Sequence, residues 1–257
     1  MATFVDADWV AYRLGSPGYL VIDTRYSMRH LMGHLKSAVN VPPPKLRDAQ
    51  GSLLPPEDLA DLFGVAGLGD DVTPVLYDGY DGRNVAMIAW VLEYLGRDDV
   101  HIMDIVFDKW KEQGREVFYR PVESEPRPFS VNINPAVRAD LADIRDVTDL
   151  KLVDTRSLEE YNGQSDVDEK PGHIPRAVNL VWQELVGQDG QLQASEEETR
   201  KALDRANINP NDRVAAYCKI GGRASVAYLA MKRLGYDVRL YPGSYKEWER
   251  SGLPIEK

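Results

Sequence analysis

Short apolar runs alternate along the chain with stretches in which apolar residues recur every three or four positions. Runs of four or so apolar residues bounded by polar and turn-forming positions are typical of buried strands, and the longer periodic stretches are typical of helices. The pattern predicts buried strands at Leu20–Asp23, Val75–Tyr77, Leu152–Asp154, Val214–Tyr217 and Val238–Leu240.

Two helices are predicted after Arg83 and after Arg223. In each stretch the apolar residues have i, i+3, i+4 spacing, so one face of the helix is expected to be buried. These residues are Val85, Ile88, Ala89 and Leu92 in the first helix, and Val226, Leu229, Ala230 and Leu234 in the second. Alternating strands and helices are typical of an α/β fold with a mainly parallel sheet and helices on both faces. Ligands bind beyond the carboxyl ends of such strands, which points to the loops after Tyr77 and Tyr217.

The pattern occurs twice in the chain. Both Val21–Arg25 and Leu152–Arg156 end in Asp-Thr-Arg, and a Gly-His pair follows each of them. Gly-Arg opens both predicted helices, and a tryptophan stands near the end of each half, at Trp110 and Trp248. Several segments recurring in the same order indicate two copies of one domain.

A polar stretch with three prolines, Arg120–Pro128, separates the two copies. This composition is typical of an extended linker. We therefore predict one domain over residues 1–120, a linker over 121–130 and a second domain over 131–257. Each domain is long enough to enclose one hydrophobic core.

Composition narrows the class of protein. The 257 residues are 43% hydrophobic with a formal net charge of −10, which is normal for a globular chain and unfavourable for binding nucleic acid. No apolar run approaches the roughly 18 residues of a membrane helix, and no signal peptide is visible. We expect a cytoplasmic protein that binds neither nucleic acid nor membranes, and a monomer, since two domain copies already form a pseudo-dimer.

The only cysteine is Cys218, so neither an intrachain disulfide nor a multi-cysteine metal site can form. It directly follows the predicted strand Val214–Tyr217, and Asp78 holds the same place in the first copy. We expect no metal ion and no organic cofactor.

The loop from Cys218 to Arg223 has the features of a reactive thiol site. A helix N-terminus and neighbouring cations stabilise a thiolate, and the segment Arg213–Arg223 contains three basic residues and no acidic one. Gly221 and Gly222 allow a tight turn whose backbone N–H groups form an anion-binding nest. In the first copy, Asp78 and Asp81 bring negative charge to the same nest, so that loop is expected neither to react nor to bind anions.

Two alternatives stand beside this interpretation. A lone cysteine is often a buried structural residue, and Lys219 and Arg223 are the kinds of side chain that lie solvated on a surface. The glycines, the cations and the position at a strand end favour the reactive thiol.

At this point the chain resembles the tandem-domain rhodaneses, which are thiosulfate sulfurtransferases. The resemblance covers both halves and rests on Asp154-Thr155-Arg156, Glu160-Tyr161, Gly172-His173-Ile174-Pro175, the Cys218–Arg223 loop and Trp248. It implies two tandem rhodanese-like domains, the first inactive with Asp78 in place of cysteine and the second catalytic. It further implies that Cys218 carries a persulfide and passes the sulfane sulfur of thiosulfate to cyanide or a thiol without a cofactor. The expected substrate-binding residues are Lys219, Ile220, Gly221, Gly222, Arg223 and Arg176.

Loop length and loop charge separate the related chemistries. Cysteine phosphatases of similar fold place five residues between cysteine and arginine, whereas four separate Cys218 from Arg223. The 3-mercaptopyruvate enzymes have a largely neutral loop, whereas Lys219 and Arg223 suit dianionic thiosulfate. A 3-mercaptopyruvate sulfurtransferase, or a persulfide carrier or binding module with little turnover, remains the alternative.

The segment before the second Gly-His pair departs from the family pattern. The family's substrate-binding arginine often follows His-Ile directly. Here Pro175 stands at that position and Arg176 comes next. Two placements are therefore open for the Arg176 side chain, in the pocket or on the surface. Asp154 to His173 spans 19 positions, against 11 from Asp23 to His34. Two placements are open to the extra acidic piece, residues 163–170, namely the rim of the site or a plain surface loop, and we expect the surface loop. We expect His173 to stabilise its turn, because His34 recurs in the copy without the cysteine.

Overall fold

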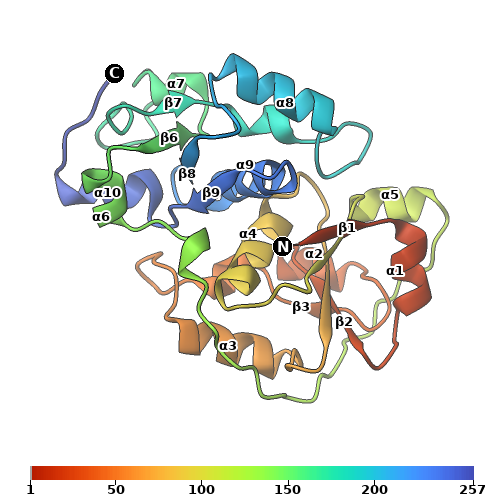
Figure 1. The fold of residues 1–257 in the computed structure, drawn as a ribbon. Helices are drawn as coiled ribbons and strands as arrows, with labels where there is room; N and C mark the ends of the chain where they lie inside the picture. Colours follow the sequence, from red (N-terminus) through yellow and green to blue (C-terminus); the bar gives the residue numbers. More distant parts are fainter. Residues whose placement is uncertain (1) are drawn as a thin grey trace. The chain divides into compact units, whose positions relative to one another are not determined.

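The computed structural model describes residues 2–257 and divides into two compact units, each of which is an α/β unit built on one parallel sheet (Figure 1). The first unit is the chain up to Asn134 together with Gln188–Leu192. The second is Pro135–Gly187 together with Gln193–Lys257. Residues 121–130 carry no helix or strand and run along the first unit, where Arg127 pairs with Asp71 and the Ser130 hydroxyl binds Asp70.

The first unit has a five-stranded parallel sheet in the order β1-β5-β4-β2-β3. Its strands are β1 (Thr3–Val5), β2 (Tyr19–Asp23), β3 (Val39–Asn40), β4 (Thr73–Tyr77) and β5 (His101–Met103). Its helices are α1 (Ala7–Arg13), α2 (Ser27–Leu31), the 3-10 helix η1 (Pro43–Leu46), α3 (Pro56–Val65), α4 (Arg83–Tyr94) and α5 (Phe107–Glu112). The strands predicted at Leu20–Asp23 and Val75–Tyr77 and the helix predicted after Arg83 are confirmed as β2, β4 and α4.

The second unit repeats this arrangement with four strands in the order β7-β6-β8-β9. The strands are β6 (Leu150–Asp154), β7 (Val178–Asn179), β8 (Arg213–Tyr217) and β9 (Asp237–Leu240). The helices are η2 (Pro135–Val137), α6 (Leu141–Asp146), α7 (Leu158–Tyr161), η3 (Trp182–Leu185), α8 (Glu196–Arg205), α9 (Gly222–Arg233) and α10 (Ser244–Ser251). Beside β9, an isolated parallel bridge between Arg138 and Leu240 takes the place that β1 has in the first unit. The remaining predicted strands and the helix predicted near Arg223 are confirmed.

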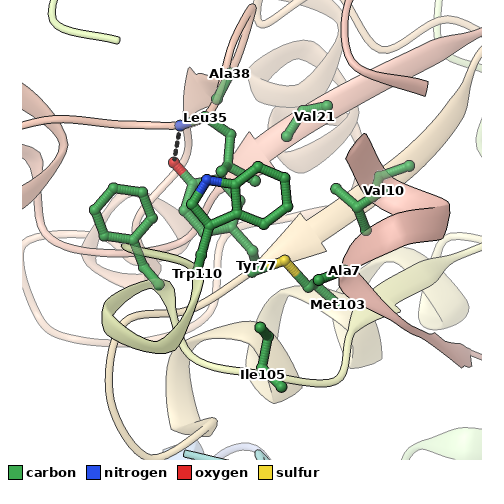
Figure 2. Packing of buried hydrophobic residues seen from close by; sticks show 11 residues of the cluster. Ala7, Val10, Val21, Leu35, Ala38, Tyr77, Met103, Ile105 and Trp110 are labelled. Atoms are coloured by element: carbon green, nitrogen blue, oxygen red, sulfur yellow. Dashed lines mark hydrogen bonds between the residues drawn. The ribbon is translucent and has the colours of Figure 1, made fainter. Parts of the chain in front are cut away.

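Both faces of the first sheet are buried, as the α/β prediction requires. On one face, side chains of alternate strand residues such as Val21 and Met103 pack against Val10 of α1 and Trp110 of α5 (Figure 2). The opposite face carries Ile22, Leu76 and Ile102, which are also fully buried. Continuous apolar runs, rather than alternating ones, follow from burial on both sides of the strands.

A buried tyrosine at the end of the central strand joins sheet and turn in each unit. The Tyr77 hydroxyl donates to Asp23 Oδ2 at 2.6 Å and accepts the N–H of Leu35 at 3.2 Å, the bond drawn in Figure 2. In the second unit the Tyr217 hydroxyl accepts the N–H of Ile174, also at 3.2 Å. The repeated tyrosine therefore fixes the Gly-His segment against the carboxyl end of the sheet.

Backbone geometry explains the glycine of each Gly-His pair. Gly33 and Gly172 have φ angles of +126° and +136°, a region that residues with a Cβ rarely adopt. A Cβ on Gly172 would also stand 2.2 Å from the carbonyl oxygen of Glu256, because the chain end pairs there with His173. The glycine thus allows the C-terminal segment to lie against the turn.

The tyrosine contact can be tested by Tyr77→Phe. Removing the hydroxyl leaves the buried Asp23 carboxylate and Leu35 N–H each short of one partner, so the free energy of unfolding should fall by about 1–3 kcal/mol. Urea denaturation followed by circular dichroism measures the change. Tyr80→Phe is the matched control, because Tyr80 is 81% exposed, and it should stay within about 0.5 kcal/mol of the wild type. Equal effects of the two substitutions would contradict this account.

Candidate active site

Cys218 lies between β8 and α9, at the carboxyl end of the second sheet, and only 1% of its surface is exposed. The N–H of Gly221 points at its sulfur, with 3.1 Å between N and Sγ. Its carbonyl accepts the N–H of Tyr245, and its own N–H donates to the Ser244 hydroxyl. The thiol is therefore buried beneath its own polar loop. This loop turns back through Gly221, whose φ is +98°.

In the first unit, Asp78 stands at the position that corresponds to Cys218. The Asp78 carboxylate accepts the N–H groups of Gly79 at 2.7 Å, Asn84 at 3.2 Å and Val85 at 3.3 Å. Burial raises the pKa of Asp78, and the backbone hydrogen bonds oppose that rise. Two of these N–H groups, those of Asn84 and Val85, belong to the first turn of α4. A carboxylate of the protein itself therefore occupies this helix N-terminus in the first unit, as predicted for Asp78, whereas Asp81 pairs with Arg83.

Arg223, at the start of α9, forms a two-point ion pair with Glu160 of α7. The distances are 2.5 Å from Nη1 to Oε2 and 2.9 Å from Nη2 to Oε1. Burial would lower the pKa of Arg223, but the bond to Glu160 and the neighbouring Cys218 sulfur raise it instead. Glu160 therefore fixes the guanidinium, and Arg223 and the Cys218 sulfur interact electrostatically. In the first unit, the equivalent Arg83 pairs with Asp81 of its own loop.

Lys219 is held by the extra segment that the first unit lacks. Its Nζ lies 2.5 Å from Asp168 Oδ1 and 2.6 Å from the carbonyl oxygen of Val167. The other oxygen of Asp168 lies 2.7 Å from Nη1 of Arg156, whose side chain is fully buried. One carboxylate therefore joins the candidate active loop to the buried guanidinium of Arg156.

The expectation that residues 163–170 form a plain surface loop is wrong. Asp168 is buried, and Tyr245 donates its hydroxyl hydrogen bond to the Lys170 carbonyl at 2.6 Å. Glu249 of α10 accepts the Lys170 N–H at 2.5 Å. Acidic composition suggested a solvated segment, but its second half is fastened to α10 and to the Cys218 loop by ion pairs and hydrogen bonds.

Arg156 of the Asp-Thr-Arg motif organises these contacts. Asp154 binds it through Nε and Nη2, the Gly172 carbonyl accepts Nη2 at 2.7 Å, and the Tyr245 ring lies 3.9 Å from its central carbon. Burial would lower the pKa of Arg156, but the bonds and charge of Asp154 raise it. It stays charged, and its charge is matched by the carboxylates around it.

The site is formally neutral, although the local sequence predicted a cationic loop. Three cations and three carboxylates are paired here in two groups. Arg156 binds Asp154 and Asp168, and Asp168 also binds Lys219. Arg223 pairs separately with Glu160. The acids come from β6, α7 and the extra segment, which are distant in sequence from the loop. Glu160 and Asp168 are thus site residues that the sequence analysis did not assign; the one signal for Asp168 was an acidic insertion present only in the copy with the cysteine.

The structure does not bring Arg176 to the loop. The residue has a φ of +71°, and its guanidinium donates to the carbonyls of Ile144 at 3.2 Å and Thr148 at 3.4 Å. The other predicted residues lie together in the loop after Cys218, where the Ile220 side chain is partly exposed and Gly222 begins α9.

The histidines have structural partners. His173 stacks on Tyr161 with ring centres 3.7 Å apart and binds its carbonyl through Nδ1 at 2.8 Å, so it holds the turn, as expected. His34 lies between the carbonyls of Leu35 and Arg120. Within residues 2–257, His, Cys, Asp and Glu nowhere form a group of three or more placed to hold a metal ion. Every helix in this range is too short or too polar to cross a membrane.

Comparison with known proteins gives consistent matches to both halves. The family model described as "Rhodanese-like domain" matches residues 6–113 and 137–251. A thiosulfate sulfurtransferase of Corynebacterium glutamicum is 31% identical over 98% of this chain and 89% of its own. One of Pseudomonas aeruginosa is 30% identical over 96% of this chain and 94% of its own.

Solved structures share the fold at lower identity. The 3-mercaptopyruvate sulfurtransferase SseA of Escherichia coli matches with a TM-score of 0.86 and 24% identity, over 95% of this chain and 99% of its own. EanB, in complex with ergothioneine, matches with a TM-score of 0.90 and 22% identity, over 99% of this chain and 70% of its own. At these identities the likeness concerns the fold.

The ion pair behind Arg223 can be tested by Glu160→Gln. Although burial raises it, the pKa of Glu160 is held below its ordinary value of 4.5 by Arg223. A carboxyl whose pKa is lowered by folding stabilises the fold above its unfolded pKa and loses that contribution as pH falls through the folded value. At pH 7 the variant should lose about 2 kcal/mol of unfolding free energy. Urea denaturation should show the difference from wild type shrinking below about pH 4.5.

Glu169→Gln is the matched control for this measurement, because Glu169 is an exposed acid in the neighbouring segment. It should unfold like the wild type at every pH. A wild-type advantage over Glu160→Gln that stays constant down to pH 3 would show that the ion pair is not its source.

Proposed function

The chain belongs to the rhodanese family, and we propose that it is a thiosulfate sulfurtransferase whose second unit carries the sulfur on Cys218. The observation that carries the proposal is the loop around this thiol, where the Gly221 N–H meets Sγ and Arg223 stands beside it. The names of relatives about 30% identical over nearly the whole chain support thiosulfate as the donor.

The first half-reaction forms the persulfide. The Cys218 thiolate attacks the outer, sulfane sulfur of thiosulfate, a Cys–S bond forms, and the S–S bond of thiosulfate breaks. Sulfite leaves with the bonding electron pair, so no oxidant or reductant is consumed. The cations Lys219 and Arg223 stabilise the charge that collects on the departing sulfite, and loop amides stabilise the terminal persulfide sulfur.

The second half-reaction returns the enzyme to its starting state. Cyanide or a thiol attacks the terminal persulfide sulfur, and the thiolate of Cys218 leaves. With cyanide, the product is thiocyanate. The cycle is ping-pong, because sulfite departs before the acceptor reacts. No step needs a metal ion or an organic cofactor.

The first unit supports a non-catalytic role for its own loop in this proposal. Asp78 offers no sulfur nucleophile, and its carboxylate accepts the backbone N–H groups of Gly79 in the loop and of Asn84 and Val85 at the start of α4. We assign catalysis to residues 131–257 and treat residues 1–120 as the inactive domain.

A second candidate is a 3-mercaptopyruvate sulfurtransferase, which would use the same Cys218 persulfide. The neutral pairing of the loop cations favours it, because Lys219 and Arg223 each have a carboxylate partner. Steady-state kcat/KM values for thiosulfate and 3-mercaptopyruvate, with cyanide as acceptor, separate the two donors. A stable persulfide with very low turnover on either donor would indicate a sulfur carrier.

The persulfide can be tested by intact mass spectrometry. Wild-type protein treated with thiosulfate should gain the mass of one sulfur atom and lose it on addition of cyanide. Cys218→Ser should show no such gain, because it lacks the accepting thiol, and should form no thiocyanate while keeping its circular dichroism spectrum. Thiocyanate formation retained in Cys218→Ser would end the proposal.

Asp78→Asn is the matched control at the equivalent position of the first unit. It keeps hydrogen-bonding atoms in the loop and leaves Cys218 untouched, so persulfide formation should persist. Loss of the sulfur adduct in a folded Asp78→Asn protein would contradict the assignment of the chemistry to the second unit alone.

A further inference from the structure

The ammonium group of Lys219 binds two oxygen atoms of the extra segment. Asp168 Oδ1 lies 2.5 Å from it and the Val167 carbonyl 2.6 Å. Only 1% of the Asp168 side chain is exposed, against 25% for Lys219. The carboxylate is thus a buried anion, and the lysine is the more exposed member of the pair.

Asp168 is held in place from three sides. Arg156 binds its second oxygen at 2.7 Å, while Tyr245 and Glu249 bind the backbone of Lys170 two residues further on. Its position does not depend on Lys219 alone, since the buried Arg156 guanidinium pairs with the same carboxylate. An anion that competes for the Lys219 ammonium therefore leaves these other contacts of the segment in place.

The two copies of the domain show that the lysine and the carboxylate occur together. The first unit keeps the scaffold, because Arg25 binds Asp23 and the Gly33 carbonyl as Arg156 binds Asp154 and the Gly172 carbonyl. It lacks the extra segment, and its loop has Gly79 where the second has Lys219. The unit with the thiol has both the cation and the buried anion that neutralises it.

From this geometry we propose that Asp168 is a specificity-determining residue that sets how strongly the Cys218 loop prefers a doubly charged sulfur donor. The inference rests on the proposed function. With Asp168 in place, a donor anion must compete with a buried carboxylate for the Lys219 ammonium, and the carboxylate repels the donor in proportion to the donor's charge. Asp168 therefore lowers the affinity for dianions more than for monoanions.

Two anions of nearly equal shape test the proposal. Thiosulfate carries two negative charges, and methanethiosulfonate, with a methyl group in place of one oxygen, carries one. Calorimetric titration into Cys218→Ser protein measures binding without sulfur transfer. Adding Asp168→Asn should tighten binding of thiosulfate about tenfold and that of methanethiosulfonate about threefold, because a Coulomb contribution scales with ligand charge.

Asp166→Asn in the same Cys218→Ser background is the matched control. It removes the same charge from the same segment, but Asp166 is exposed. It should change neither affinity by more than about twofold, since exposed charges are screened. Asp168→Glu, which keeps the carboxylate, should restore the wild-type ratio of the two affinities, and Lys219→Gln should weaken thiosulfate more than methanethiosulfonate.

The outcomes are distinct from those that test the proposed function. The role of Asp168 would be overturned if Asp168→Asn changed the affinities for the two anions by the same factor. It would also be overturned if Asp166→Asn had the same effect as Asp168→Asn, or if no variant bound either anion. If Asp168→Asn fails to fold, the test uses Lys219→Gln. An unchanged ratio of thiosulfate affinity to methanethiosulfonate affinity in that variant overturns the proposal. Failure of the proposed function appears separately, as the absence of a sulfur adduct on wild-type Cys218.

Discussion

The second unit is organised by the need to match one buried charge, the guanidinium of Arg156. An unpaired buried ion costs several kcal/mol, so every direction of this group is filled. Carboxylates of Asp154 and Asp168, the carbonyl of Gly172 and the ring of Tyr245 surround it. These partners belong to β6, the extra segment, the Gly-His turn and the start of α10. Satisfying one cation thereby fixes four parts of the chain around the cysteine loop.

The two units share a scaffold and differ in the residue that follows the central strand. Arg25 repeats the contacts of Arg156 with its own aspartate and glycine carbonyl, and the ring of Phe107 covers it at 3.8 Å. Strand order and turn geometry are also repeated. Backbone N–H groups after the central strand then meet a carboxylate, as at Asp78, or a thiol, as at Cys218. One side chain at the end of the central strand separates a closed anion site from a candidate reactive one.

Local patterns predicted most of the fold, because apolar periodicity and internal repetition are properties of neighbouring residues. The position of Cys218 between strand and helix follows from the same signals. The pairs Glu160–Arg223 and Asp168–Lys219 join residues 63 and 51 positions apart, and no local window contains both members. A count of charges within the loop therefore predicted a cationic site where the fold builds a neutral one. Arg176 stands one position beyond the family's usual arginine, and its guanidinium binds the carbonyl of Ile144 and not the loop.

Neutrality is compatible with the proposed reaction. Thiolate and thiosulfate carry the same total charge as persulfide and sulfite, so the loop must stabilise a movement of negative charge rather than additional charge. Fixed donors suit that task, because a preorganised dipole does not have to reorient during the reaction. Glu160 holds Arg223 at the sulfur, and Asp168 holds Lys219 at the loop. The carboxylates reduce the net attraction of the site for anions. They also keep both cations at the loop, where negative charge collects on the departing sulfite.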